Sequence, residues 1–250
     1  MEIGKKSYQV KLDLGAEFAS FYQKDLCEID KKFCGNYLTF DVRGNKYDKP
    51  MYEVLGAKIY GLEIPKITVL EESPDFTVNA TIHGDAEKPN CSGRIGREIF
   101  DKKNFLLDFA SSKIVFCRNF NDLAKDRYDL KKFIKVPFHV NQLGICFRVE
   151  TDLGEQILLL DTGASCCFLR TPPQKESLSI ESFHTLPLWH SKKFILGSCE
   201  FGPRDFVLFE MTPLMDAIDG ALGMDFLKQH AIYIDSKKQV AYIGKNCRED

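Results

Sequence analysis

The feature that most constrains the fold of this chain is a repeat within its own sequence. Residues 93–100 and 220–227 each carry two glycines three residues apart, with an apolar residue before the second glycine. In each copy an acid, Asp108 or Asp235, follows fifteen residues after the first glycine and ends a short apolar run. Agreement at several offsets predicts two copies of one structural unit in a single chain. Asp is common in turns because it bonds the local backbone, so we expect these two acids to be structural.

A second feature is an apolar run that ends in functional residue types. Leu158, Leu159 and Leu160 are followed directly by Asp161, Thr162 and Gly163. A short apolar run predicts a buried strand, and a carboxylate at the end of a buried strand is costly unless it is paired or hydrogen-bonded. Asp161 is therefore a candidate functional residue. An ordinary Asp-Thr-Gly turn is the alternative, because Asp and Gly are frequent turn residues.

The two features together resemble the signature of the retropepsin-like and pepsin-like aspartic proteases. Asp-Thr-Gly-Ala-Ser at 161–165 matches the active-site loop of these families, and Gly-Ala-Leu-Gly at 220–223 matches the segment that accompanies it. The resemblance covers about residues 133–250. It implies a bilobal, mainly β fold and the hydrolysis of peptide bonds in a polypeptide substrate, with no metal and no organic cofactor.

The resemblance also implies a role for each residue of the loop. Asp161 is one of two carboxylates that act on a shared water. Gly163 lets the backbone turn without a Cβ clash. The hydroxyl of Thr162 braces the two active-site loops, and Ser165 bonds the outer oxygen of the neighbouring aspartate.

The repeat requires an equivalent acid in the first half, and Asp13 stands at the expected place. The alternation of Tyr8, Val10 and Leu12 predicts a strand with one buried face, and Asp13-Leu14-Gly15-Ala16 follows it. Asp-Leu-Gly alone is a weak pattern. Placed by the repeat, it predicts Asp13 as the catalytic partner of Asp161, with Gly15 as support of the loop.

The first half departs from the signature at two positions. Leu14 replaces the threonine, which removes one half of the implied hydroxyl brace. Glu17 stands where the second half has Ser165, and we expect it to be exposed because unpaired acids are rarely buried. These departures keep open a folded relative that binds peptides without cleaving them. A third possibility is a retropepsin-type homodimer that uses Asp161 from two chains.

Composition excludes several other function classes. The net charge of −2 over 250 residues gives no sign of a nucleic-acid footprint. No apolar run approaches the length of a membrane span, and the first residues lack the apolar segment of a signal peptide. We therefore expect a cytoplasmic protein, monomeric or homodimeric, that contacts neither nucleic acid nor membrane. The nine cysteines fit reduced thiols in a reducing compartment, with a disulfide framework plus one free thiol as the alternative.

These patterns predict an acid-protease β-barrel fold with an internal pseudo-two-fold repeat. We expect a divergent lobe at 1–118, a connecting segment at 119–132 and a second lobe at 133–250. Strand-like runs around residues 43–45 predict a hairpin in the first lobe, which is either a flap over the substrate or an ordinary surface hairpin. The predicted function is that of an aspartic endopeptidase using Asp13 and Asp161.

Overall fold

The computed structural model describes residues 1–41, 44–59, 61–72, 91–126, 128–172, 180–183 and 186–245. The chain forms two compact units, Met1–Ile99 and Phe100–Asp250. Unit 1 ends earlier than the predicted first lobe, because strands β9 (Phe105–Asp108) and β10 (Lys113–Phe116) share a sheet with the last strands of the chain. None of the helices in the described part of the chain has the length and apolar character needed to cross a membrane.

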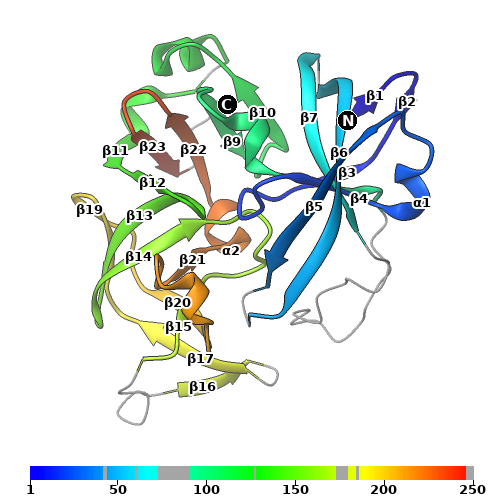
Figure 1. Ribbon diagram of the computed structural model, residues 1–250. Helices are drawn as coiled ribbons and strands as arrows, with labels where there is room; N and C mark the ends of the chain where they lie inside the picture. The colour runs from blue at the N-terminus through cyan, green and yellow to red at the C-terminus, as the bar shows by residue number, and fades with distance from the viewer. Residues whose placement is uncertain are drawn as a thin grey trace. The chain divides into compact units, whose positions relative to one another are not determined.

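Unit 1 contains one twisted sheet of eight strands in the order β2-β1-β6-β7-β4-β8-β3, with β5 beside β6 (Figure 1). Its strands are β1 (Glu2–Ile3), β2 (Lys6–Ser7), β3 (Val10–Leu12), β4 (Ala19–Tyr22), β5 (Lys32–Phe40), β6 (Lys46–Ile59), β7 (Leu62–Glu72) and β8 (Gly93–Ile95). Its helical turns are α1 (Gln23–Leu26) and η1 (Arg97–Phe100), the second of which runs into unit 2.

Unit 2 contains two sheets. The larger has the order β16-β17-β20-β15-β21-β14-β13-β18-β19, with β12 paired to β13. Its strands are β12 (His139–Asn141), β13 (Gly144–Thr151), β14 (Gly154–Leu160), β15 (Phe168–Arg170), β16 (Ile180–Phe183), β17 (Leu186–Ser191), β18 (Phe194–Leu196), β19 (Cys199–Glu200), β20 (Arg204–Phe209) and β21 (Gly220–Leu222). The helical turns η5 (Pro213–Met215) and α2 (Met224–Leu227) flank β21 in the sequence.

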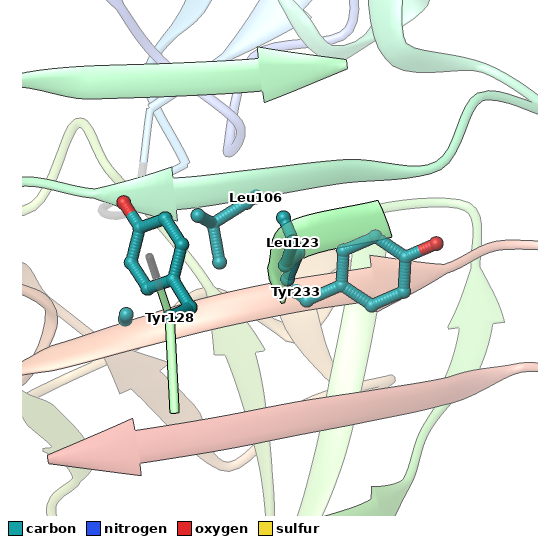
Figure 2. Close-up of a cluster of buried hydrophobic side chains, with 5 residues drawn as sticks. Leu106, Leu123, Tyr128 and Tyr233 are labelled. Carbon is teal, nitrogen blue, oxygen red and sulfur yellow. The ribbon is translucent and has the colours of Figure 1, made fainter. Parts of the chain in front are cut away.

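The smaller sheet of unit 2 has the order β10-β9-β22-β23-β11. Besides β9 and β10 it contains β11 (Phe133–Pro137), β22 (His230–Asp235) and β23 (Val240–Lys245). The turns η2 (Phe120–Asp126) and η3 (Leu130–Lys132) occupy the predicted connecting segment. Leu123 of η2 and Tyr128, which lies between the two turns, pack with Leu106 of β9 and Tyr233 of β22 in the core of this unit (Figure 2).

The strand pairing repeats between the two units. The order β6-β7-β4-β8-β3 of unit 1 corresponds to β17-β20-β15-β21-β14 of unit 2. Each of the four pairings also keeps its direction: β3 with β8 and β14 with β21 are parallel, and so are β4 with β7 and β15 with β20. The other two are antiparallel in both units. The predicted mainly β fold with an internal repeat is therefore confirmed.

The acids that end β9 and β22 act locally. Oδ1 of Asp108 accepts a hydrogen bond from the backbone N–H of Ser111, and Oδ1 of Asp235 accepts one from Lys238. The other oxygen of Asp108 accepts the hydroxyl of Tyr128 at 2.7 Å. Both acids are buried, and their bonds within the turn explain how they tolerate burial.

Candidate active site

Asp161 stands at the carboxyl end of β14, where the chain leaves the larger sheet of unit 2. Its backbone N–H donates to the carbonyl of Leu222 on the parallel neighbour β21. Its Oδ1 accepts the N–H of Gly163 at 2.8 Å, which closes a tight turn. Thr162 is buried, whereas Gly163 and Ser165 are exposed. The loop therefore holds the acid by its backbone at the end of a buried strand.

Asp13 stands at the equivalent place in unit 1. Its backbone N–H donates to the carbonyl of Ile95 on β8, as that of Asp161 does to Leu222 on β21. Further along, the N–H of Arg97 donates to Ala16, which corresponds to the bond from Met224 to Ala164 in unit 2. Gly15 follows Asp13 at the position of Gly163. The two acids lie in different units, and their action as a catalytic pair stays a prediction.

One glycine in each unit makes the same close contact between neighbouring strands. A Cβ on Gly93 would lie 2.0 Å from the carbonyl oxygen of Ser20, and one on Gly220 would lie 2.0 Å from that of Phe168. Real side chains cannot approach a backbone oxygen so closely. Strand β8 therefore packs against β4, and β21 against β15, at a distance that only glycine permits.

The side chain next to this glycine distinguishes the two units. In unit 2 it is Ala221, which pairs with Phe168. In unit 1 it is Arg94, which pairs with Ser20 and forms an ion pair from Nη1 to Oδ2 of Asp13 at 2.9 Å. Oδ1 of Asp13 meanwhile accepts the N–H of Ala16. Both oxygens of the Asp13 carboxylate thus have partners within unit 1.

The ion pair belongs to a chain of four alternating charges. Nη2 of Arg94 contacts Glu72 on β7 at 2.9 Å, and the other oxygen of Glu72 contacts Nζ of Lys49 on β6 at 2.6 Å. Glu72 and Lys49 are both buried. Burial alone lowers the pKa of Arg94, but the carboxylates of Asp13 and Glu72 outweigh it and raise the pKa above its ordinary value. Burial also lowers the pKa of Lys49.

Glu17, the second departure from the signature, is exposed as expected. Its Oε2 accepts the hydroxyl of Tyr37 on β5 at 2.8 Å and lies 3.8 Å from Nη2 of Arg97. The ring of Tyr37 also contacts that of Phe18 edge to face. The predicted hairpin exists as β5 and β6, and this contact ties it to the Asp13 loop.

An acid follows the second glycine of both copies. In unit 1, Glu98 accepts the backbone N–H of Thr68 through Oε1. Burial raises the pKa of Glu98 to about 7, against the opposing effect of that hydrogen bond. In unit 2, Oδ1 of Asp225 accepts the N–H groups of Cys167 and Phe226. These acids attach the turn after the second glycine to other segments of the same unit: Glu98 accepts from β7, and Asp225 accepts from the residue before β15.

The thiols beside the Asp161 loop are poor nucleophiles. Burial raises the pKa of Cys166 to about 11 and raises that of Cys167 well above its ordinary value. A thiol in this state carries little thiolate at neutral pH, which argues against cysteine-protease chemistry here. Within the described residues, no group of three or more His, Cys, Asp or Glu side chains is arranged to hold a metal ion.

Comparison with known proteins supports the fold. The chain resembles the crystal structure of Basic 7S globulin from soybean with a TM-score of 0.52, covering 95% of this chain and 90% of that chain. The fold is the bilobal aspartic-protease fold. At 11% sequence identity the likeness extends to the fold alone and does not reach the retropepsin family. No protein-family model matches the sequence, and no curated protein resembles it significantly.

The sequence predicted the positions of Asp13, Gly15, Asp161, Thr162, Gly163 and Ser165 in two loops. It missed Arg94, although the residue lies inside the repeated segment that revealed the fold. A signal was present, because an arginine in register with Ala221 breaks the apolar pattern of that segment. A partly buried cation on β8 requires a carboxylate nearby, and Asp13 directly follows the adjacent strand β3.

Proposed function

We propose that this chain is an aspartic-type endopeptidase whose catalytic acids are Asp161 and Asp13. The observation that carries this proposal is the equivalence of the two acids. Asp13 follows β3, which is parallel to β8, and Asp161 follows β14, which is parallel to β21; the N–H of each acid donates to that neighbouring strand. An aspartic protease needs one such acid from each half. A polypeptide is the proposed substrate, and no cofactor is required.

The chemistry of such a pair follows from two carboxyl groups with one proton between them. Two like charges held close together do not both ionise at low cost, so the pair titrates as a unit. The ionised acid accepts a proton from water as the water oxygen bonds the carbonyl carbon. The protonated acid donates a hydrogen bond to the carbonyl oxygen, and a proton is delivered to the leaving amine as the C–N bond breaks.

The loop residues of unit 2 are proposed to support this chemistry. Thr162 is buried and directly follows Asp161 in the sequence. Gly163 binds Oδ1 of Asp161 through its N–H and so orients the carboxylate. Ser165 and Gly15 are assigned the supporting positions that the resemblance gives them.

A second candidate is a peptide-binding protein that keeps the fold without the activity. Two observations favour it, and both come from unit 1. Leu14 offers an apolar side chain where unit 2 has Thr162, and Arg94 forms an ion pair with Asp13. An acid whose oxygens are both engaged presents fewer free lone pairs to a water molecule.

One experiment separates these functions. The purified chain is incubated with an unfolded polypeptide from acid to neutral pH, with and without a transition-state analogue of peptide hydrolysis, and analogue binding is measured by calorimetry in parallel. The endopeptidase predicts cleavage that the analogue suppresses. Binding of the analogue or polypeptide without cleavage at any pH would establish the second candidate. Neither binding nor cleavage would overturn both.

A further inference from the structure

The smaller sheet of unit 2 has an internal symmetry that follows from its strand register. Strand β9 pairs with β22 so that Leu106 lies opposite Tyr233. These two residues are equivalents in the repeat, because each stands two residues before the acid that ends its strand, Asp108 or Asp235. Since the two copies of one position lie opposite each other, a pseudo-two-fold axis passes between the strands at this pair.

The next strand on each side obeys the same symmetry. β10 pairs antiparallel with β9 so that Lys113 lies opposite Asp108, and β23 pairs antiparallel with β22 so that Val240 lies opposite Asp235. Beyond β23 the sheet continues with β11, whereas no described strand pairs with the outer edge of β10. In the described part of the chain the sheet therefore has five strands, although its symmetry has places for six.

The outer edge of β10 has the properties of a strand that accepts a neighbour. In an antiparallel sheet every second residue of an edge strand directs its N–H and C=O outward, and no described residue bonds these groups of β10. Ile114, Val115 and Phe116 form a consecutive apolar run, and each is only half-buried. Val115 packs against the cluster of Figure 2, and Phe116 stacks on Phe100. An apolar edge of this kind is a template for pairing with another chain.

Strand β11 indicates how a strand would fill the sixth place. It runs antiparallel to β23 and places Val136 opposite Ala241, with Ile134 two residues away on the same side. Ala241 is the equivalent of Ile114, because each lies six residues after the acid of its copy. The symmetry therefore predicts a strand that runs antiparallel to β10, with one apolar side chain opposite Ile114 and a second opposite Phe116.

The charges that flank β10 indicate the chemistry of the occupant. Lys113 and Arg118 stand on either side of the apolar run, and both are exposed. Neither forms an ion pair within the described residues. Antiparallel pairing of two copies of β10 would bring Lys113 of one copy toward Arg118 of the other, and like charges across a strand pair are unfavourable. A segment with an acidic residue at each end would instead pair with both cations.

We propose that the outer edge of β10 is a docking site for an extended segment of a partner polypeptide, which binds antiparallel as the sixth strand of this sheet. Its recognition chemistry is that of strand addition, in which main-chain hydrogen bonds give affinity and alternate side chains give specificity. The segment carries alternate apolar residues that cover Ile114 and Phe116. An acidic residue at each end pairs with Lys113 or Arg118. This surface belongs to unit 2 alone, and the proposal does not depend on peptidase activity.

The test measures how the full chain binds a fluorescently labelled peptide containing Glu-Phe-Ile-Thr-Val-Glu, by fluorescence anisotropy. The peptide copies residues 133–136 with Thr in place of Lys135, and in the register of β11 its two glutamates lie opposite Arg118 and Lys113. We expect saturable binding and slower hydrogen exchange of the backbone amides at 113–116, because strand addition covers this edge.

N-methylation of the peptide separates strand pairing from side-chain contacts alone. Methyl groups on the alternate amides that face β10 remove several hydrogen bonds and should weaken binding by about tenfold or more. Methyl groups on the other alternate set face away from β10 and should leave the affinity nearly unchanged. Equal affinities of the two methylated peptides would contradict strand addition.

Charge reversal tests the recognition of the two cations. The variant Lys113→Glu/Arg118→Glu should bind the peptide about fivefold or more weakly, and it should bind a version with lysine at both ends better than the parent does. The matched control is Lys192→Glu/Lys228→Glu, because both of these lysines are exposed residues of unit 2. Its affinity for the peptide should equal that of the parent.

Three further results would overturn the proposal. An unchanged affinity in the charge-reversed variant would exclude recognition by the two cations, and no binding at millimolar peptide would exclude the docking site. Dimerisation of the chain without peptide, measured by sedimentation at increasing protein concentration together with slower exchange at 113–116, would identify a second copy as the occupant of this edge in place of a partner.

Discussion

The loops that carry Asp13 and Asp161 share two backbone hydrogen bonds and differ in their side chains. The backbone N–H of Asp13 donates to β8, and that of Asp161 donates to β21. In each unit a later backbone N–H also donates to the carbonyl of an alanine in the loop, Ala16 or Ala164. The differences are Leu14 for Thr162, Glu17 for Ser165 and Arg94 for Ala221. Strand register and close-packed glycines set the position of each acid, while the side chains around the two acids differ.

The comparison also shows where unit 1 has become more polar than unit 2. Around Asp13, three strands contribute Lys49, Glu72 and Arg94, which are connected by ion pairs of 2.6 to 2.9 Å. A buried ion pair costs desolvation free energy when it forms. Removing one partner costs more, because the remaining charge is then buried without a counter-ion. The network therefore specifies one arrangement of unit 1 and resists the loss of any member.

The largest effect is expected from the glycine that both units share. Gly93→Ala and Gly220→Ala each place a Cβ 2.0 Å from a backbone oxygen, so each should lower the free energy of unfolding by more than about 4 kcal/mol or prevent folding. Gly197→Ala is the control. Its Cβ would lie 3.6 Å from the nearest atoms, which is an ordinary contact, and its positive φ of 61° should cost about 1 to 2 kcal/mol. Urea unfolding measures all three. A small loss of unfolding free energy in only one of the Gly93→Ala and Gly220→Ala variants would contradict the equivalence of the two units.

The next largest effect is expected in unit 1, which contains the charge network. Lys49→Met leaves Glu72 buried with one cation fewer, and removing one partner of a buried pair should cost about 3 to 4 kcal/mol. Lys66→Met, which breaks an exposed pair with Glu53, should cost much less, because exposed ion pairs contribute little to stability. Equal losses in the two variants, measured by urea unfolding, would show that the network contributes no more than a surface ion pair.

A smaller effect should appear as a pH dependence of stability. Burial raises the pKa of Glu98 from 4.5 to about 7 in the folded chain. The native state then binds more protons than the unfolded state between these values, so its stability is fully present below about pH 4.5 and falls as pH rises through 7. The difference between these two pKa values corresponds to about 3.4 kcal/mol. Because Glu98 is only partly buried, solvent screening should reduce the measured amount to about 2 kcal/mol, and Glu98→Gln should flatten this slope.

The control for Glu98 is the exposed Glu200. Glu200→Gln should leave the slope of unfolding free energy against pH unchanged. Thermal or urea unfolding at several pH values gives both slopes. A slope that survives in Glu98→Gln would place its origin in another group.

The smallest effect concerns the apolar residue beside Asp13. Leu14→Thr restores the side chain found at the equivalent position of unit 2. One restored hydrogen bond is worth about 0.5 to 1.5 kcal/mol, so turnover should rise by up to about tenfold. Leu14 is buried, so a hydroxyl without a partner would lower stability instead. An unchanged rate in a stable variant would mean that the missing hydroxyl does not limit activity.

Sequence reasoning reached the framework because the framework is encoded locally. The spacing of Gly93 and Gly96 repeats that of Gly220 and Gly223, and such spacing survives when side chains diverge. The local turns of Asp108 and Asp235 were predictable for the same reason. The internal repeat was predicted from this spacing, and the strand order that the two units share confirms it.

Lys49 and Glu72, the other members of the charge network, were beyond reach for a physical reason, although the sequence held a signal for Arg94 and its partner Asp13. Lys49, Glu72 and Arg94 meet because of the register between β6 and β7 and the crossover that sets β8 beside β4. A shift of one residue in any of these pairings would turn a side chain to the opposite face. Among many dispersed charges, the sequence alone gives no means of choosing the ones that meet.

The most direct test of the account is cleavage by Asp13→Asn and Asp161→Asn at two protein concentrations. Asn preserves the shape of Asp but cannot act as the base, so each variant should lose about a thousandfold or more in kcat while remaining folded, and the double variant should be no worse. A homodimer using two copies of Asp161 predicts a nearly silent Asp13→Asn and activity per chain that falls on dilution. Full activity in Asp13→Asn would contradict the one-chain dyad, and full activity in Asp161→Asn would contradict every aspartic-protease mechanism for this chain.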